Sequence, residues 1–217
     1  MQNGDPTSPF NYANAGFAFN YQFINIKSGK EFCPTPHFFQ NLEEAEFAVA
    51  LYMYMCLKGY SPDKITILTT YNGQKYLIRD IIHQKCSWST LFKKPSKVTT
   101  VDKFQGQQND FIILSLVRSE YVGHMRDPRR MIVAFSRARL GLYVLGKFDI
   151  FEVYPEMKAT FAQFKKLPLA LHLCPEEKEQ SKRASDAPVP ENGVRVIQNN
   201  QDLYAEVQNL LKLTLSH

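Results

Sequence analysis

The sequence has few of the features that mark metal-binding or disulfide-linked proteins. Four cysteines are spread through 217 residues, with no C-x-x-C pair and no Cys or His partner at zinc-ligand spacing. The five histidines show neither a catalytic-triad arrangement nor metal-ligand spacing. We therefore expect no metal site, and we interpret the cysteines as reduced, structural thiols: Cys33, Cys56, Cys86 and Cys174.

Signals for export and for membrane insertion are also absent. The first ten residues lack a basic segment followed by an apolar one, and no N-x-S/T acceptor occurs. The longest apolar run, FAVALYMYMCL, is too short to span a bilayer. We expect a soluble, intracellular protein that does not bind membranes. A formal charge of +5 and a pI near 8.9 allow a polyanionic partner without requiring one.

The distribution of apolar residues predicts the fold class. Hydrophobic residues make up 44% of the chain, which suffices for one packed core. Strands are predicted over the apolar runs at 21–26, 64–70, 98–101, 110–117 and 141–146. Helices are predicted at 41–60, after the turn 71–74, and over 127–139. This alternation is typical of a mainly parallel sheet covered on both faces, so we predict a three-layer α/β domain over residues 1–174, with a polar leader at 1–18.

The composition changes after residue 174. Residues 175–193, PEEKEQSKRASDAPVPENG, are charged and rich in Pro and Ser, and they offer little surface to bury. We expect a disordered linker here. The last segment, 194–217, contains DLYAEVQNLLKLTL, whose apolar stripe predicts an amphipathic docking helix.

Three polar segments, at 71–74, 102–110 and 127–139, interrupt the apolar pattern. Ligands of open parallel sheets bind beyond the carboxyl ends of the strands, and we expect all three segments to lie there. Amides, arginines and a glycine at 106 suit phosphate, ribose and base edges. We therefore expect Arg137 and the bend around Gly106 to face the same rim of the sheet.

Two residues of the first polar segment have two interpretations each. Gln74 shares a helical face with Ile78 and Ile81, so its amide either faces a ligand or caps the local turn. Tyr71 either approaches the same ligand or packs in the core.

The arginines of the third segment can be sorted by angle. At about 100° per residue, a helix running to residue 139 places Arg130 and Arg137 at the border of its packed face. It directs Arg129 and Arg139 away from that pair. Arg137 is then either a cation aimed into a cleft or one partner of a surface ion pair.

A cluster of lysines precedes the second polar segment. Lys93, Lys94 and Lys97 could hold phosphates, but a charge run on a loop is usually solvated. We favour solvation for these side chains.

These segments resemble motifs of the superfamily 1 helicases of the RNA-decay type. T-T-Y-N-G-Q at 69–74 is similar to motif IV, T-V-D-K-F-Q-G-Q-Q-N-D at 100–110 to motif V, and D-P-R-R-M-I-V-A-F-S-R-A-R at 127–139 to motif VI. The three occur in the family's order. Longer stretches within residues 13–175, such as FFQNLEEAEFAVALYMYMCLKGY and AFSRARLGLYVLGKF, resemble the intron-binding, spliceosomal branch of this family.

The resemblance implies a fold and an activity. The chain would be the second RecA-like lobe, of the P-loop NTPase type, of an ATP-dependent RNA helicase. Its expected partners are single-stranded RNA of the pre-mRNA intron, spliceosomal proteins and the first RecA-like lobe of the same protein. The expected location is the nucleus.

The resemblance also implies roles for residues. Arg137 would be the arginine finger that reaches the γ-phosphate, with Gly106 and Gln108 near the nucleotide. Tyr71 and Gln74 would approach the nucleotide from motif IV. Thr100 would touch the nucleic-acid backbone. Family members commonly carry Glu at the position of Gln108, so the sequence departs from the family there.

Some parts of a complete motor are missing from the sequence. There is no G-x-x-x-x-G-K-[ST] phosphate loop, no acidic strand end to hold Mg²⁺, and no upstream glutamine-tyrosine-arginine motif. We expect a fragment that begins partway into the lobe, is inactive alone, and uses ATP and Mg²⁺ only within the full-length protein. Two alternatives stay open: a catalytically idle, helicase-like scaffold lobe in a ribonucleoprotein, and a lobe of a superfamily 1 DNA helicase.

Overall fold

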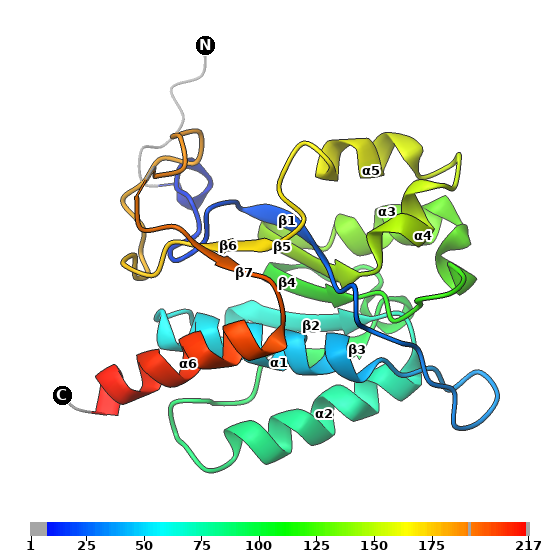
Figure 1. Cartoon of the computed structure of the whole chain (residues 1–217), viewed down its shortest axis with the longest axis horizontal. Coiled ribbons are helices and arrows are strands. Elements are labelled where there is room, and N and C mark those ends of the chain that lie inside the picture. The colour runs from blue at the N-terminus through cyan, green and yellow to red at the C-terminus, as the bar shows by residue number, and fades with distance from the viewer. Residues whose placement is uncertain (1–7, 191, 216–217) are drawn as a thin grey trace.

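The computed structural model describes residues 8–190 and 192–215. A five-stranded parallel sheet lies at the centre, with the strand order β1-β5-β4-β2-β3 (Figure 1). Its strands are β1 (Tyr21–Asn25), β2 (Ile65–Thr69), β3 (Lys97–Thr100), β4 (Asn109–Ser115) and β5 (Ala138–Gly146). Every residue of β2 and β4 is buried, as the central strands of a parallel sheet require.

Helices cover both faces of the sheet (Figure 1). One face carries α1 (Leu42–Leu57), α2 (Asn72–Cys86) and α6 (Asn200–Leu215), and the other carries α3 (Pro128–Phe135), α4 (Phe148–Glu152) and α5 (Lys158–Phe164). Side chains alternate between the two layers along each strand. Ile113 and Tyr143 belong to the first core cluster, whereas Leu114 and Val144 belong to the second. The predicted three-layer α/β, RecA-like architecture is therefore confirmed.

Helix starts follow the local sequence. The Asn41 side chain caps α1 by accepting the N–H of Glu44 at 3.2 Å. The Asp127 side chain caps α3 by accepting the N–H of Arg129 at 2.9 Å, and Pro128 occupies the first position of that helix. Asn and Asp are among the residue types preferred at this position. Four short 3₁₀ turns complete the helical elements: η1 (Pro9–Asn11), η2 (Pro62–Lys64), η3 (Asp102–Phe104) and η4 (Gly123–Arg126).

The helix predicted over 127–139 is wrong at its carboxyl end. α3 stops at Phe135, and β5 already begins at Ala138, which pairs with Asn109 of β4. The backbone of residues 138–140 belongs to strand β5, so these residues cannot continue the helix. The angular argument for Arg137 and Arg139 therefore fails, because neither residue is on α3.

The end of the chain packs against the domain. Within the predicted linker at 175–193, residues 175–190 contact the leader, and the N–H of Ala13 donates to the carbonyl of Arg183 at 2.8 Å. Arg183 in turn pairs with Glu177 at 2.7 Å. A short antiparallel ladder of β6 (Leu171–Leu173) and β7 (Arg195–Ile197) leads into α6, which lies along α1. Leu203, Val207 and Leu211 are the buried apolar residues of this helix.

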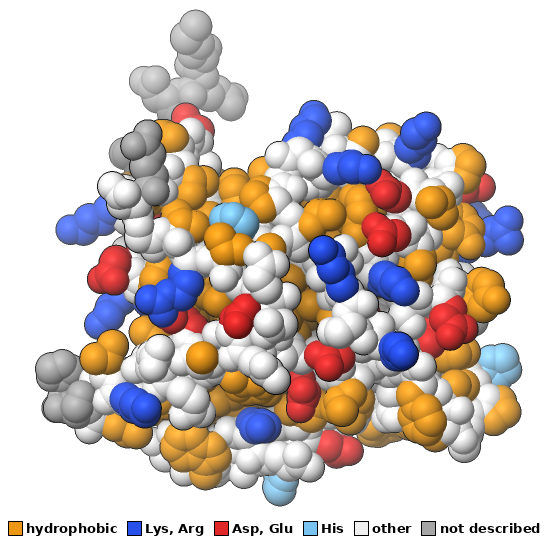
Figure 2. All heavy atoms as spheres, in the orientation of Figure 1, with side chains coloured by type: hydrophobic (Ala, Val, Ile, Leu, Met, Phe, Trp, Pro, Cys, Tyr) orange, Lys and Arg blue, Asp and Glu red, His pale blue; other side chains and the backbone are white. Residues whose placement is uncertain are grey.

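Among the residues that the structure describes, no helix has the length and apolar character needed to cross a bilayer. Figure 2 shows Lys and Arg side chains interspersed with Asp and Glu over the visible face, without one dominant patch. This distribution agrees with the small net charge.

Candidate functional site

The bend at 105–108 and Arg137 meet at one end of the sheet. Nη1 of Arg137 donates to the main-chain oxygen of Gln107 at 3.0 Å, and the side-chain amide of Gln108 donates to the carbonyl of Ser136 at 3.3 Å. Their meeting follows from the sheet register, because the bend runs directly into β4 and Arg137 directly into the neighbouring strand β5. The expectation that Arg137 and the bend share a rim is confirmed.

This rim is not the one that we expected. Asn109 begins β4 and Ala138 begins β5, so the bend and Arg137 lie at the amino ends of the strands. The prediction of carboxyl ends is wrong here for a topological reason. The chain that connects two parallel strands must run from the carboxyl edge of the sheet back to its amino edge. The bend ends the connection that leads into β4, and Arg137 ends the connection that leads into β5.

The guanidinium of Arg137 is held by neutral acceptors. Nε donates to the carbonyl of Val133 at 2.8 Å, and Nη2 donates to Oγ of Ser136 at 2.9 Å. Together with the bond to Gln107, these contacts use three of the five N–H groups of an arginine. One N–H on each terminal nitrogen remains, and two such groups match a phosphate oxygen pair.

The neighbouring arginines differ from Arg137 in their charge partners. Arg129 lies 3.3 Å from Asp127, Arg130 lies 3.9 Å from Asp102, and Arg139 lies 2.5 Å from Asp110. Within the described part of the chain, Arg137 has no carboxylate in salt-bridge distance. The geometry therefore disfavours the surface ion pair and leaves a positioned, uncompensated positive charge.

Gly106 forms the tip of the bend. Its φ of +75° is a conformation that side chains rarely adopt, and a Cβ placed there would meet no atom within 4 Å. Glycine is thus required by the backbone rather than by packing inside the domain. The space in front of the bend is open to a ligand or to another protein surface.

Gln74 lies at the opposite edge of the sheet, next to the carboxyl end of β4, and is fully buried. Its Nε2 donates to the carbonyl of Asn41 at 2.9 Å and to Oγ of Ser115 at 3.1 Å, while its Oε1 accepts the N–H of Asn41 at 2.7 Å. Both amide donors are therefore satisfied inside the protein. This geometry supports a structural role, although the partner is the cap residue of α1 and not the local turn.

Tyr71 lies at the same carboxyl edge as Gln74 and away from Arg137. It is 4% exposed, and its ring packs edge-on against Phe39 with a centroid distance of 5.0 Å. Its hydroxyl accepts a hydrogen bond from Arg118 at 3.3 Å. The structure thus does not bring Tyr71 and Gln74 together with Gly106, Gln108 and Arg137, and nucleotide binding by these two residues stays a prediction that the geometry does not support.

Thr100 ends β3 and is also at the carboxyl edge. It pairs in register with Thr69 of β2 and is 5% exposed, whereas Thr69 is fully buried. The hydroxyl of Thr69 has no hydrogen-bond partner among the described residues. The nucleic-acid contact predicted for Thr100 would therefore lie on a different edge from the Arg137 rim.

A buried carboxyl group was missed by the sequence analysis. Glu44 accepts hydrogen bonds from Oγ of Ser115 at 2.7 Å and from the N–H of Val117 at 2.8 Å. Burial raises its pKa from 4.5 to about 8 in spite of these bonds. The sequence places Glu44 in the first turn of α1, but burial of that turn is not visible in the sequence.

Val117 and Arg118 form a second unpredicted feature. Val117 has a φ of +73°, which is strained for a β-branched residue. The next residue, Arg118, pairs with Glu31 at 3.0 Å and stacks over Phe39 at 4.1 Å. Burial raises the pKa of Glu31, but bonds from Arg118 and two backbone N–H groups outweigh it and hold that pKa below its usual value. This carboxyl edge is therefore rigidly organised.

The side chains of the described residues can be compared with those that binding of the expected ATP and Mg²⁺ requires. The described residues contain no group of three His, Cys, Asp or Glu side chains that could hold a metal ion. The Arg137 rim does fit one side of a triphosphate, because it offers free N–H donors and an unpaired positive charge.

Comparisons with known proteins agree with this architecture. A family model described as an AAA domain matches residues 5–149. The chain is 50% identical over 204 residues to "RNA helicase aquarius" of Mus musculus, which covers 93% of the chain and 14% of that protein. It is 36% identical over 167 residues to "Pre-mRNA-splicing factor cwf11" of Schizosaccharomyces pombe, covering 75% of the chain and 13% of that protein.

A third relative extends the range of similarity. "Regulator of nonsense transcripts 1" of Dictyostelium discoideum is 33% identical over 146 residues, covering 66% of the chain and 11% of that protein. The chain thus spans about a seventh or less of the length of these relatives. Its parallel sheet, its helicase-like segments and these similarities lead to one conclusion: the chain belongs to the AAA-domain family of superfamily 1 helicases and forms a RecA-like helicase lobe similar to that of RNA helicase aquarius.

Proposed function

We propose that this chain is the second motor lobe of an ATP-dependent RNA helicase and that Arg137 is its arginine finger. The observation that carries the proposal is the Arg137 guanidinium, which is fixed to the bend at Gln107 and has no carboxylate partner among the residues that the structure describes. A structural arginine in this position would be expected to have one, as Arg139 does with Asp110.

The residues of the rim have distinct tasks in this mechanism. A triphosphate bound by the first lobe would supply the phosphoryl group that is transferred to water. When the lobes close, Arg137 donates its free N–H groups to the oxygens where negative charge develops. The bonds to Val133, Gln107 and Ser136 keep the guanidinium oriented, so that less conformational entropy is lost at that moment. The open bend at Gly106 lets the neighbouring lobe and the nucleotide approach the backbone.

Nucleic acid would bind at the other edge. Thr100 at the carboxyl end of β3 is our candidate for a contact to the phosphate backbone of single-stranded RNA. Two relatives carry names that refer to RNA helicase activity and to pre-mRNA splicing. We extend this role to the present chain as an intron-binding lobe in the spliceosome, located in the nucleus, with the first RecA-like lobe and spliceosomal proteins as partners.

The test requires a protein that contains both lobes. In such a protein, Arg137→Ala is expected to lower RNA-stimulated ATP hydrolysis by about 10³-fold or more. Arg130→Ala is the matched control, because Arg130 belongs to the same segment but forms an exposed ion pair with Asp102. Hydrolysis that survives Arg137→Ala unchanged would disprove the motor role.

One observation favours the idle-scaffold alternative. Gln108 stands where family members commonly carry Glu, and its amide is engaged with the carbonyl of Ser136. A two-lobe protein that binds RNA but shows no RNA-stimulated ATP hydrolysis would support this second function. Comparing stimulation by RNA with stimulation by DNA of the same sequence tests the remaining DNA-helicase alternative.

A further inference from the structure

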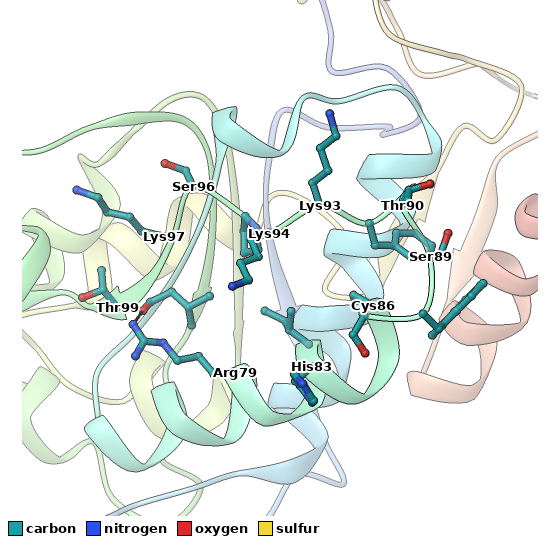
Figure 3. Close-up of a pocket in the computed structure, with 16 residues that line it drawn as sticks. Arg79, His83, Cys86, Ser89, Thr90, Lys93, Lys94, Ser96, Lys97 and Thr99 are labelled. Atoms are coloured by element: carbon teal, nitrogen blue, oxygen red, sulfur yellow. Dashed lines mark hydrogen bonds between the residues drawn. The ribbon is translucent and has the colours of Figure 1, made fainter.

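A groove lies on the flank of the domain, and one of its lining residues, Lys97, donates to the side-chain oxygen of Gln107 in the bend. The groove is enclosed by α2, by the loop at 87–96 and by the edge strand β3, and has a volume of about 930 Å³ (Figure 3). This is the size of sites that hold small molecules or several peptide residues. None of the residues to which we assign nucleotide or RNA binding lines it.

The loop that closes the groove is fixed by the rest of the domain. The hydroxyl of Tyr52 on α1 donates to the carbonyl of Lys93, and the N–H of Ser96 donates to the carbonyls of Pro62 and Ile65 at 2.8 and 2.9 Å. The indole N–H of Trp88 donates to the carbonyl of Lys85 at 2.6 Å. The groove is therefore preformed, which lowers the entropic cost of binding.

Positive charge gathers along one side of the groove. Arg79 and Lys94 line it, together with His83. Lys94 extends toward the space between Arg79 and His83, whereas Lys93 extends in the opposite direction (Figure 3). No Asp or Glu occurs among the described residues that line the groove. A ligand that carries negative charge is therefore electrostatically complementary to this surface.

The floor of the groove is apolar. Ile82, Cys86, Phe92 and Val98 line it. Burial raises the pKa of the Cys86 thiol to about 12, so this cysteine is neutral and acts as an apolar contact rather than as a nucleophile. A ligand that fits must combine carboxylates with at least one apolar side chain.

A peptide matches this chemistry better than a nucleic-acid strand. Proteins that bind single-stranded nucleic acid stack its successive bases on exposed aromatic side chains along a positively charged groove. Here Phe92 is buried, with Trp88 packed edge-on against it at 5.9 Å, so only the half-exposed indole of Trp88 offers a face among the lining residues. The edge of β3 is partly covered as well, because Arg79 donates to the carbonyl of Val98 at 2.8 Å. Side-chain anchoring is therefore favoured over addition of a strand to the sheet.

We propose that this groove is a docking site for an acidic segment of a partner protein, which places an apolar side chain on the floor between Ile82 and Phe92 and carboxylates against Lys94 and Arg79. The proposal goes beyond the motor function and does not depend on it, since neither Arg137 nor the other residues assigned to nucleotide or RNA binding line the groove.

Phage display on this chain tests the proposal. A random peptide library is panned on the protein, and enriched peptides are synthesised and titrated by fluorescence. Trp88 is the only tryptophan of the sequence and lines the groove, so its emission reports directly on occupancy. We expect the enriched peptides to carry Asp or Glu around an apolar residue.

Two variants with the same charge change locate the binding site. Lys94→Glu is expected to weaken peptide binding by about tenfold or more, because it reverses a charge inside the groove. Lys93→Glu, the matched control, is expected to change it by less than about threefold, because that side chain points away. Circular dichroism verifies that both variants are folded.

Three results would overturn the proposal. The first is enrichment of peptides without acidic residues. The second is equal binding to the wild type and to Lys94→Glu. The third is a short uridine oligonucleotide that quenches Trp88 and loses affinity in Lys94→Glu while displacing the peptides, because the groove would then be part of an RNA path.

Discussion

Nη1 of Arg137 lies 3.0 Å from the carbonyl oxygen of Gln107, and this bond joins a segment that precedes β5 to one that precedes β4. The two segments are 30 residues apart in the sequence. Because the carbonyl is neutral, the bond orients the guanidinium without neutralising its charge. The same arginine can therefore be both rigid and available to an anion.

The first prediction concerns the planar geometry of the Arg137 guanidinium, as distinct from its charge. Arg137→Lys keeps the positive charge but cannot bond to Val133, Gln107 and Ser136 while also presenting two parallel donors. We expect RNA-stimulated ATP hydrolysis of the two-lobe protein to fall by about 10²-fold or more. Steady-state hydrolysis at saturating RNA measures the effect.

Arg139→Lys is the control for this prediction. Arg139 is half-exposed and pairs with Asp110, which an ammonium group can also reach, so we expect less than about a twofold change in hydrolysis. A fully active Arg137→Lys protein would show that charge alone suffices and that the orientation of the guanidinium is irrelevant.

The second prediction separates the backbone role of Gly106 from its role at the site. Gly106 and Gly193 have φ values of +75° and +82°, and a Cβ on either would meet no atom within 4 Å. Changing either one to Ala is expected to cost about 1 kcal/mol of unfolding free energy, through backbone strain. Urea unfolding of the isolated chain measures this cost.

Only Gly106→Ala is expected to lower ATP hydrolysis as well, because the added methyl group and the altered backbone disturb the rim that faces the nucleotide. We expect a decrease of about tenfold in the two-lobe protein, with Gly193→Ala close to wild type. Equal hydrolysis by both variants would mean that nothing approaches the bend.

The sheet and its caps could be predicted because their signals are local. β2 and β4 are buried on both faces, so each appears in the sequence as a continuous apolar run. The caps at Asn41 and Asp127 depend on a side chain and an N–H two or three residues away. The shared rim of Arg137 and Gly106 was also predictable, since the resemblance to helicase motifs placed both at the nucleotide.

The remaining features depend on partners distant in sequence. Ser136 to Arg139 can form a helix as readily as a strand, and pairing with β4 decides between them. Gln74 is satisfied by Asn41, which is 33 residues away, so a rule based on the local turn could not identify its partner. The segment at 175–190 is polar, and its contacts, the ion pair of Arg183 with Glu177 and the bond from Ala13 of the leader to Arg183, cannot be read from its composition.

The third prediction addresses the carboxyl edge. Thr100→Val removes a hydroxyl group while keeping the shape of the side chain, and we expect the affinity of the two-lobe protein for single-stranded RNA to fall by about fivefold, the effect of one hydrogen bond. Fluorescence anisotropy with a labelled uridine oligonucleotide measures it. Thr69→Val, on the adjacent strand, is the control, because its fully buried hydroxyl cannot reach RNA.

A further expectation concerns the effect of Thr69→Val on the unfolding free energy. The Thr69 hydroxyl has no partner among the described residues, so its removal is expected to leave the unfolding free energy unchanged or to raise it by about 1 kcal/mol. Unchanged RNA affinity in Thr100→Val would remove this residue from the RNA path.

The fourth prediction concerns pH. Burial raises the pKa of Glu44 to about 8 in the folded chain, whereas an unfolded chain has the ordinary value of 4.5. Between these two values the folded state binds one more proton than the unfolded state. The stabilisation is therefore complete below pH 4.5 and is lost as pH rises toward 8, by up to about 1.4 kcal/mol per pH unit from this residue.

Urea unfolding at several pH values between about 5 and 8 measures this slope. Glu44→Gln removes the titrating group, so the variant is expected to lose less stability than the wild type over that range, even if it is less stable throughout because Ser115 and Val117 lose a carboxylate acceptor. Glu120→Gln removes an exposed carboxyl group and is the control, expected to keep the wild-type slope. If Glu44→Gln and the wild type have parallel pH profiles, then Glu44 is ionised inside the fold, and Asn41, Ser115 and the N–H of Val117 together stabilise its charge against burial.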